Sequence, residues 1–379
     1  MGTALATDGR LKLLIWTVIP THYQSAFFAA IRAHQDVDLA VNYFGRVTPD
    51  RFALGWDEPT NLPPGERYVP SSLAALEACP DWRERIHILP GYNMPFLLVL
   101  PLRLSLSRVS WLHWSEGSRR TLRSRLFYPV KRYYGGLVNR FGAGALAIGD
   151  TAAQTFVHWG ISPSKIRFLP YTGPAPEHTA SGAGAARPGQ GPRFLFLGVL
   201  NHRKAVDVLL RAFRTVVGAY PGSRLDLVGN DESNGSYLRL AEALGIAEAV
   251  NFAGSVSPGK IGEALSRCDV FVLPSRYDGW GIVLNEAAAL GKPLIGTETC
   301  GAAHHLIAPG RNGFRVRTAD EQALAQAMLE YCRDPALIES HGRESRVVFR
   351  EFTPERNATR LLDALESLLG CTRHPAPGR

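Results

Sequence analysis

The sequence predicts an α/β protein with two parallel-sheet domains, on the strength of three observations. Its 379 residues exceed what one hydrophobic core usually holds, which indicates two or three domains. Short apolar runs alternate with helical stretches in both halves, a pattern typical of parallel sheets with helical crossovers. Residues 173–193, rich in Gly, Ala and Pro, interrupt this alternation and predict a linker. The predicted domains are therefore residues 1–172 and 194–348, followed by a final helical segment over 349–372.

The first half contains four apolar runs that predict buried strands. These strands are expected over residues 11–18, 38–44, 109–113 and 144–148. A loop over residues 19–25 follows the first run and leads into a helix that we expect to begin near Ala26.

The second half repeats the alternation more regularly. Strands are expected over residues 194–198, 224–229, 250–254, 270–274 and 294–296, and helices over 206–220, 236–244 and 259–267. A last helix over 354–369 is amphipathic, and its apolar side carries Leu361, Leu362, Ala364, Leu365 and Leu368.

The composition is that of a globular protein, with 20% charged and 45% apolar residues. No apolar run reaches the ~18–20 residues that a membrane-spanning helix needs. The N-terminus lacks a basic segment followed by an apolar core, so secretion is not expected. Five scattered cysteines without a C-x-x-C pair predict a reducing cytoplasm and no cysteine metal site. We expect the adjacent His304 and His305 to lie in a loop or on the surface.

The net charge of +8 is concentrated in the first half. Residues 1–171 contain 19 Lys and Arg against 12 Asp and Glu, whereas the remainder is nearly neutral. Between Glu116 and Asp150 there is no acidic residue, and four aromatic residues interleave with seven cations: Arg119, Arg120, Arg123, Arg125, Lys131, Arg132 and Arg140. This pattern favours an anionic membrane surface or a phosphorylated acceptor, with a solvated helix face as the alternative. Nucleic acid is not expected, because no binding motif accompanies the charge.

The clearest functional signal is the segment 275–293. Asp278 precedes a Gly-Trp-Gly turn, and Glu286 lies in the opening turns of the short helix that follows. Gly291 stands where helices often end with a left-handed residue, and Pro293 leads into the next strand. The glycines let backbone N–H groups approach a ligand, and a helix N-terminus favours an anion. The pattern fits a diphosphate flanked by sugar and ribose hydroxyls, although isolated acids here would simply complement the helix dipole.

This segment resembles the signature of the retaining glycosyltransferases of family 4, which have the GT-B fold. The family pattern is E-x7-E within S-x-x-E-G-F-G-x-x-x-x-E-A-x-A-x-G-x-P. Here Asp278 and Glu286 take the acidic positions, and Trp280 stands where Phe is common. The resemblance runs from residue 194 to about 318. It implies GT-B architecture, with two Rossmann-like parallel-sheet domains facing a cleft and a last helix crossing back to the first domain. It also implies that Asp278 contacts the transferred sugar and Glu286 the ribose.

Two adjacent cations follow the first strand of the second half. Lys204 lies six residues after Gly198, at the position of the family's lysine, and Val199 stands where the family commonly has an arginine. Arg203 beside Lys204 resembles a variant in which both cations serve the diphosphate. A cation pair at a helix start is unfavourable, which argues against an ordinary basic pair. We therefore predict Asp278, Arg203 and Lys204 as catalytic. The predicted donor-binding residues are Gly198, Asn230, Val256, Gly279, Trp280, Gly281, Ile282 and Glu286.

The first half is expected to bind the acceptor. The segment 20–24 replaces the family's glycine-rich loop, and His22 and Tyr23 within it are predicted acceptor contacts. His113 and Glu116 end a strand, where polar side chains can enter a binding site. We predict His113 as catalytic and Glu116 as acceptor-binding. For each of them, a packed and hydrogen-bonded residue is the alternative.

The resemblance implies a metal-independent retaining glycosyltransferase without a cofactor. It would move a sugar from a nucleotide-diphosphate-sugar to a hydroxyl of a glycan, lipid-linked or small-molecule acceptor. One alternative is an epimerase or phosphorylase of the same fold. Another is a non-catalytic partner subunit with a degenerate donor site, motivated by the Asp-for-Glu change and the missing arginine. We expect a cytoplasmic location, with peripheral membrane attachment if the basic stretch binds lipid.

Overall fold

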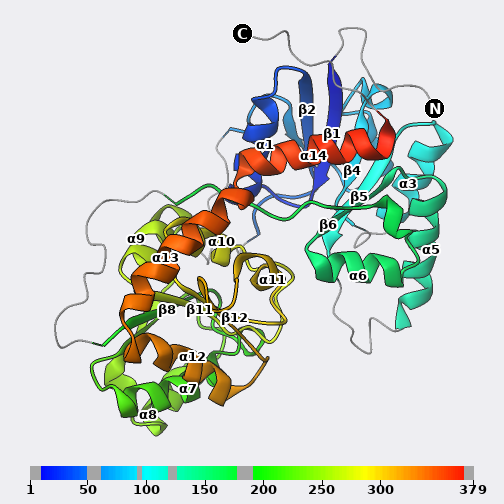
Figure 1. Cartoon of the computed structure of the whole chain (residues 1–379). Helices are drawn as coiled ribbons and strands as arrows, with labels where there is room; N and C mark the ends of the chain where they lie inside the picture. Colours follow the sequence, from blue (N-terminus) through cyan, green and yellow to red (C-terminus); the bar gives the residue numbers. More distant parts are fainter. Residues whose placement is uncertain (1–9, 49–60, 92–95, 118–125, 177–190, 371–379) are drawn as a thin grey trace, which may run out of the picture. The chain divides into compact units, whose positions relative to one another are not determined.

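The computed structural model describes residues 10–48, 61–91, 96–117, 126–176 and 191–370. The chain divides into two compact units (Figure 1). Unit 1 comprises Met1–Val47, Glu58–Tyr171 and Pro354–Arg379, and unit 2 comprises Thr48–Asp57 and Thr172–Thr353. The last helix therefore belongs to the same unit as the first strand.

Unit 1 is built on a seven-stranded sheet of described residues, in the order β3-β2-β1-β4-β5-β6-β7. Its strands are β1 Leu11–Thr17, β2 Val37–Tyr43, β3 Glu66–Tyr68, β4 Ile86–Leu89, β5 Trp111–Glu116, β6 Gly144–Ile148 and β7 Ile166–Phe168. Every pairing is parallel. Because β1 pairs with both β2 and β4, the order of strands reverses between β1 and β4. Ligands of open parallel sheets bind beyond the carboxyl ends of the strands at such a reversal.

Helices cover the central strands of unit 1, whose residues are buried along almost their whole length, as expected for a parallel sheet covered on both faces. The helices are α1 His22–Arg32, α3 Phe96–Leu106, α5 Tyr128–Arg140, α6 Asp150–His158 and α14 Pro354–Leu369, with short 3-10 turns at Leu73–Leu76, Trp82–Glu84 and Pro163–Lys165. α14 packs beside α1 (Figure 1). Its bounds agree with the predicted last helix, and Leu361, Leu362 and Leu365 are buried as expected.

Unit 2 is built on a six-stranded sheet of described residues, in the order β10-β9-β8-β11-β12-β13. Its strands are β8 Arg193–Leu197, β9 Arg224–Val228, β10 Val250–Gly254, β11 Val270–Leu273, β12 Leu294–Thr297 and β13 Gly313–Val316. All pairings are parallel, and the order reverses between β8 and β11. The prediction of an α/β protein with two Rossmann-like parallel sheets is confirmed.

The helices of unit 2 alternate with its strands. They are α7 Val206–Ala219, α8 Ser236–Ala243, α9 Ile261–Ser266, α10 Val283–Ala289, α11 Ala303–Leu306, α12 Glu321–Arg333 and α13 Ala336–Phe349, with 3-10 turns at His202–Lys204, Ala247–Ala249, Pro258–Lys260 and Arg350–Phe352. Their amphipathic faces supply the buried side chains against the sheet, such as Val206, Leu209 and Phe213 of α7.

Three local predictions are corrected. α1 begins at His22 rather than near Ala26, because the Thr21 hydroxyl accepts from the Gln24 N–H and caps the helix. The helix expected over 259–267 is a 3-10 turn followed by the short α9, since Pro258 starts a tight turn. The adjacent histidines lie on the short helix α11 rather than in a loop; His304 is exposed, as expected, but His305 is half-buried.

Two other predictions concern residues beyond those described. Arg119, Arg120, Arg123 and Arg125 lie outside the described residues, as do residues 177–190 of the predicted linker. Among the helices that are described, none combines the length and apolar character needed to cross a membrane.

Candidate functional site

The cationic turn of unit 2 follows β8 directly. Gly198 has a φ of +151°, and a side chain added there would lie 3.5 Å from the Lys204 side chain. The Asn201 side chain accepts from the Lys204 N–H at 3.1 Å and so caps the turn His202–Lys204. Ala205 then adopts the left-handed conformation, with a φ of +56°, before α7 begins. This local geometry brings Lys204 back toward the end of β8, where its side chain is 10% exposed.

Asp278 comes to the same place from the loop after β11. Lys204 Nζ lies 2.5 Å from Asp278 Oδ2, and Arg203 Nη1 lies 3.8 Å from Asp278 Oδ1. The Asp278 carboxylate is largely buried, with 13% of the side chain exposed. The structure thus brings together the three residues of unit 2 that were predicted as catalytic, although 74 residues separate Lys204 from Asp278 in the chain.

The glycine turn after Asp278 is packed against a second loop. Gly281 has a φ of +91°, and a Cβ added there would lie 2.6 Å from the Cys300 sulfur. A Cβ on Gly301 would lie 2.3 Å from the Gly279 carbonyl oxygen. The Gly301 N–H donates to the Asp278 carbonyl at 3.1 Å. Gly281 is therefore required by its positive φ and by the nearby Cys300 side chain, and Gly301 by a close backbone approach.

Trp280 and Glu286 are both buried beside this turn. The Trp280 indole donates to Asn285 Oδ1 at 2.9 Å and stacks on the His305 ring, with ring centroids 5.6 Å apart. The Trp280 side chain therefore packs inside the protein and supports the turn. Its predicted contact with the nucleotide-sugar would be made by its backbone. Glu286 lies in the first turn of α10 and is 5% exposed. Gly291, with a φ of +69°, follows the end of this helix as predicted.

The remaining predicted donor residues lie in loops after strands of the same sheet. Asn230 follows β9, and its carbonyl accepts from the Leu200 N–H at 2.8 Å. Val256 follows β10, and Ile282 precedes α10. These loops all leave the carboxyl ends of their strands, so the predicted donor residues share one edge of the sheet.

The loops of Lys204 and Asp278 leave neighbouring strands, β8 and β11, between which the strand order reverses. Binding sites in open parallel sheets form at this point because the two loops diverge to opposite faces. The position of the ion pair is therefore the one that sheet topology alone would select for a ligand.

The structure places His113, which was predicted as catalytic, in the core of unit 1. Its side chain is fully buried, and its ring packs on Tyr134, Phe156 and Trp159. Nδ1 lies 3.1 Å from the Tyr134 hydroxyl, and Nε2 lies 2.8 Å from Ser115 Oγ. Burial lowers the pKa of His113 from 6.5 to about 3, so the ring is neutral at pH 7. It is a packed, hydrogen-bonded core residue.

The predicted acceptor residues of unit 1 gather around a residue that was not predicted, Tyr171. The Tyr23 ring lies 5.3 Å from the Tyr171 ring, and His22 packs edge-on against Tyr23 at 5.5 Å. Burial, together with the charges of Tyr23 and Glu116, raises the pKa of the Tyr171 phenol well above 10. His22 and Tyr23 follow β1, beside the reversal of strand order, and Glu116 ends β5.

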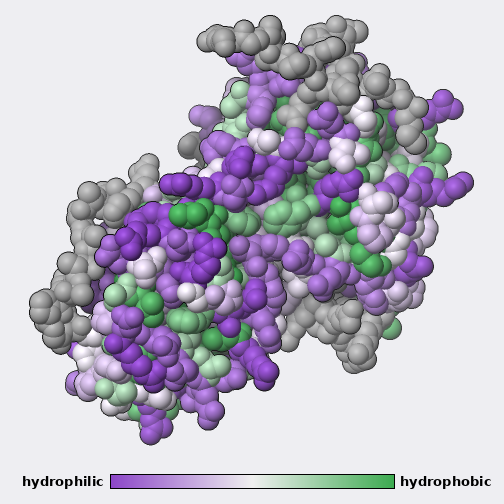
Figure 2. All heavy atoms as spheres, viewed as in Figure 1, coloured by the Kyte–Doolittle hydropathy of each residue, from purple (hydrophilic) through white to green (hydrophobic). Residues whose placement is uncertain are grey.

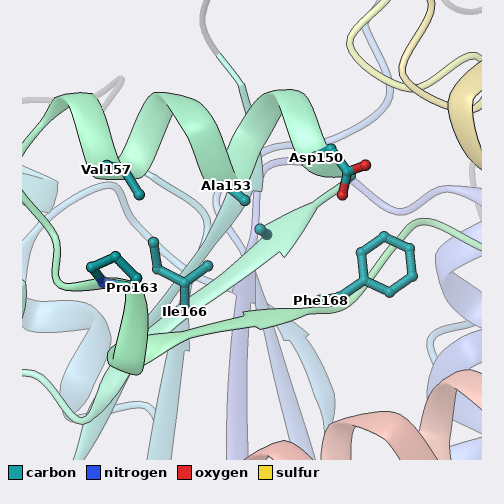
Figure 3. Close-up of a pocket in the computed structure, with 8 residues that line it drawn as sticks. Asp150, Ala153, Val157, Pro163, Ile166 and Phe168 are labelled. Carbon is teal, nitrogen blue, oxygen red and sulfur yellow. The ribbon is translucent and has the colours of Figure 1, made fainter.

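A cavity of about 270 Å³ lies elsewhere in unit 1, between β6, α6 and β7. Figure 3 shows the apolar side chains of Val157, Pro163 and Ile166 toward one end, and the Asp150 carboxylate and the Phe168 ring toward the other. No residue predicted for the site lines this cavity.

Sequence reasoning missed three polar residues that fasten the unit 2 loops. Asn201 caps the cationic turn, and its amide donates to Glu232 at 2.8 Å. Arg276 pairs with Asp207 of α7 at 2.7 Å through both guanidinium nitrogens. Asn201 had a recognisable signal, because Asn is a preferred capping residue before a turn. The Arg276–Asp207 pair joins residues 69 positions apart, which spacing cannot reveal.

Residues 183–356 match the family model of the glycosyl transferases group 1. The match covers 174 of the 379 residues, a little under half of the chain. It spans almost all of the second unit, from β8 through α13, and includes Lys204, Asp278 and Glu286.

Two curated relatives match about half of the chain. The chain is 32% identical to the D-inositol 3-phosphate glycosyltransferase of Streptomyces avermitilis over 196 residues, covering 49% of this chain and 41% of the relative. It is 29% identical to the lipopolysaccharide core biosynthesis mannosyltransferase LpcC of Rhizobium leguminosarum bv. viciae over 184 residues, covering 46% and 51%. The chain therefore spans about half the length of the curated relatives it matches.

Solved structures extend the likeness to both units. Anabaena Alr3699/HepE in complex with UDP aligns with a TM-score of 0.74 over 94% of this chain and 100% of that structure, at 15% identity. At this identity the likeness shows the fold alone. The fold of both units is that of the GT-B glycosyltransferases, as the sequence resemblance implied.

Proposed function

We propose that this chain is a retaining, metal-independent glycosyltransferase that moves a sugar from a nucleotide-diphosphate-sugar to an acceptor hydroxyl. The observation that carries the proposal is the contact of Lys204 and Arg203 with Asp278 at the strand reversal of unit 2. A diphosphate that binds the two cations brings its sugar next to the Asp278 carboxylate. That order of groups is the order of a nucleotide-diphosphate-sugar.

The cations would act chiefly on the leaving group. Negative charge builds on the diphosphate as the bond between the anomeric carbon and the phosphate oxygen breaks, and two fixed cations stabilise it more in the transition state than in the ground state. The acceptor oxygen forms its bond to the same face of the anomeric carbon, and its proton passes to the departing phosphate oxygen. Glu286 would accept hydrogen bonds from the ribose hydroxyls, since it is buried on the helix that begins beside the turn.

Unit 1 would bind the acceptor through the cluster of Tyr23, Tyr171 and Glu116. The Tyr23 and Tyr171 rings, tilted by 59° to each other, bring aromatic surface for a sugar ring to one place, and the Glu116 carboxylate can accept from sugar hydroxyls. One relative named above is a D-inositol 3-phosphate glycosyltransferase and the other a mannosyltransferase of lipopolysaccharide core biosynthesis, which supports a glycan or phosphorylated acceptor.

We further propose that helices α3 and α5 of unit 1 bind an anionic membrane surface in the cytoplasm. The two helices pack against each other, and neither contains an acidic residue. The exposed residues of the two helices and of the two positions before α5 combine apolar and basic side chains: Val99, Leu106, Leu126, Phe127, Val130, Tyr133, Arg132 and Arg140. Hydrophobic residues appear among hydrophilic ones on this side of unit 1 in Figure 2. A surface with both properties suits a negatively charged lipid interface.

Thermal-shift measurements with UDP-glucose, GDP-mannose and ADP-glucose test the donor site. A bound nucleotide-sugar at 100 times its Kd adds about 2.7 kcal/mol to the free energy of unfolding. We expect one of the three to raise the melting temperature and to be hydrolysed slowly without an acceptor. No shift with any of them would contradict the proposal. A shift without hydrolysis or transfer would favour the non-catalytic partner subunit.

Flotation with phosphatidylserine vesicles tests the membrane surface separately. The wild type is expected to float at low salt and to be released at high salt, because salt screens the basic side chains. The double variant Val130→Glu/Tyr133→Glu should float much less. Val347→Glu, an exposed apolar site on α13 of unit 2, is the matched control and should float like the wild type. Equal flotation of all three proteins would leave α5 a solvated helix face.

A further inference from the structure

Arg276 and Asp207 form the most completely bonded ion pair near the donor site. Arg276 Nη1 and Nη2 each lie 2.7 Å from one oxygen of the Asp207 carboxylate. The pair is partly shielded, with 17% of the arginine side chain and 25% of the aspartate side chain exposed. Burial raises the pKa of Asp207, but the hydrogen bonds and charge of Arg276 outweigh it and hold that pKa below its usual value. Two-point pairing of this kind fixes orientation as well as distance.

Arg276 also connects the cationic turn after β8 to the loop that carries Asp278. Its Nη1 also donates to the His202 carbonyl at 2.8 Å, and its backbone N–H donates to the Arg203 carbonyl at 2.8 Å. Arg203 returns a bond from its guanidinium to the Tyr277 carbonyl at 3.2 Å. These three hydrogen bonds, two of them made by Arg276, join the cationic turn after β8 to the loop that carries Asp278, in addition to the Lys204–Asp278 ion pair.

Electrostatics explain why the cationic turn needs this support. Arg203 and Lys204 repel each other, and both lie at the positive end of α7. The turn is connected to α7 by the left-handed Ala205 rather than by continuous helix. Asp207, in the first turn of α7, offsets the positive helix end and at the same time anchors Arg276. Without the pair, the two cations would lose their fixed position relative to Asp278.

We propose that Asp207 and Arg276 are positioning residues for the transfer reaction: they hold Lys204 and Arg203 where a diphosphate leaving group and Asp278 can be contacted at once. This inference rests on the function proposed above. Neither residue needs to touch the substrate. Since the cations act mainly in the transition state, a displaced turn reduces kcat more than it changes binding of the donor.

The test uses the full chain and whichever of UDP-glucose, GDP-mannose and ADP-glucose shifts the wild-type melting temperature. Initial rates of its hydrolysis give kcat and KM for Asp207→Asn, Arg276→Lys and the double variant. Asp207→Asn keeps the shape of the side chain and removes its charge. Arg276→Lys keeps the charge and removes the two-point geometry. Arg311→Gln is the control, because it breaks the exposed Arg311–Glu344 pair on the same unit.

We expect each single variant to lower kcat at least tenfold while KM for the nucleotide-sugar changes less than threefold. The double variant should fall no further than the worse single variant, because the two residues act as one unit. Arg311→Gln should retain wild-type kcat. The inference is overturned if Arg276→Lys or Asp207→Asn keeps kcat within twofold of wild type. It is also overturned if kcat, KM and melting temperature deteriorate together, which would mean a general folding role. A wild type that binds none of the three nucleotide-sugars overturns the proposed function itself, and the inference with it.

Discussion

Unit 1 and unit 2 have the same kind of sheet, yet their predicted site residues differ in burial and in whether they lie together. In unit 2, Lys204 and Asp278 lie 2.5 Å apart at the strand reversal. In unit 1, His113 is fully buried, and Glu116, three residues later, is exposed. Strand periodicity places a residue on a face, but the neighbours of that face decide whether it meets solvent. In unit 1 the rings of Tyr134 and Phe156 close over His113.

The difference has a physical cause in the two sequences. The unit 2 segment constrains the backbone through glycines that no other residue could replace, such as Gly281 against Cys300. Such a pattern specifies the geometry around its polar residues. A histidine at the end of a strand does not constrain the backbone around it in this way. A buried, neutral histidine fits the same strand pattern as one that faces a ligand. The predictions below test whether the two units differ in function as they do in structure.

The largest effect is expected from Lys204→Ala in unit 2. The variant removes the cation that lies nearest to Asp278. We expect kcat/KM for the nucleotide-sugar to fall about 10²–10³-fold, because the loss of one preorganised contact to the developing charge has an effect of this size. Steady-state rates of hydrolysis or transfer measure this. Lys260→Ala, at an exposed site of the same unit, should leave kcat/KM unchanged. A similar loss in both variants would contradict a specific role for Lys204.

Glu286→Ala should weaken binding of the bare nucleoside diphosphate. Loss of a hydrogen bond to a charged partner is worth about 1.5–3 kcal/mol, or roughly 10- to 150-fold in Kd. Isothermal titration with the diphosphate of the donor gives this value without any contribution from the sugar. Glu339→Ala, an exposed acid of α13, is the control. Unchanged affinity in Glu286→Ala would reject its ribose contact.

His113→Gln should change the pH dependence of stability rather than catalysis. The pKa of His113 is about 3 in the folded chain and about 6.5 when unfolded, so the unfolded state binds more protons between these values. Stability that is complete above pH 6.5 is lost as pH falls through this window, by at most ~1.4 kcal/mol per pH unit.

Urea unfolding at pH 7, 6 and 5 measures this slope, and His113→Gln should reduce it. The exposed His158→Gln should not. His87, whose pKa burial lowers to about 4, contributes a slope of its own that both variants retain. A pH profile of kcat that shifts in His113→Gln, with stability unaffected, would return His113 to the active site.

The smallest effect is expected from removal of divalent metal ions. The proposed mechanism neutralises the diphosphate with Arg203 and Lys204, so added EDTA should leave the initial rate unchanged. Loss of activity with EDTA and its recovery with Mg²⁺ or Mn²⁺ would show that the cation pair does not suffice.

Much of the fold was predictable because short stretches of sequence carry the apolar pattern of a single helix or strand. The amphipathic period of residues 354–369 predicted the last helix with the bounds that it has. β3 and β7 were not predicted, because three half-buried residues give no period to recognise. β4 was missed because His87 interrupts its short apolar run. β3, β4 and β7 all depend on pairing with strands that are distant in sequence.

The candidate site was predictable only where a resemblance supplied the long-range contact. Lys204 and Asp278 were expected to share a diphosphate-sugar on the family pattern, since no spacing rule joins residues 74 positions apart. Tyr171 was missed for the opposite reason. It follows β7 as one aromatic residue among many, and its contact with Tyr23 exists only once β1 and β7 share a sheet.

The stacking of Trp280 on His305 gives the donor site its own spectroscopic label. The other six tryptophans of the chain all precede residue 160, so Trp280 is the single indole in the second half of the sequence. It is held inside the signature turn by Asn285 and by the imidazole ring, and its own backbone belongs to the turn predicted to bind the donor. In protein labelled with 5-fluorotryptophan, one ¹⁹F resonance should therefore respond to nucleotide-sugar and disappear in Trp280→Phe. Donor binding can then be followed in the intact chain before any acceptor is known.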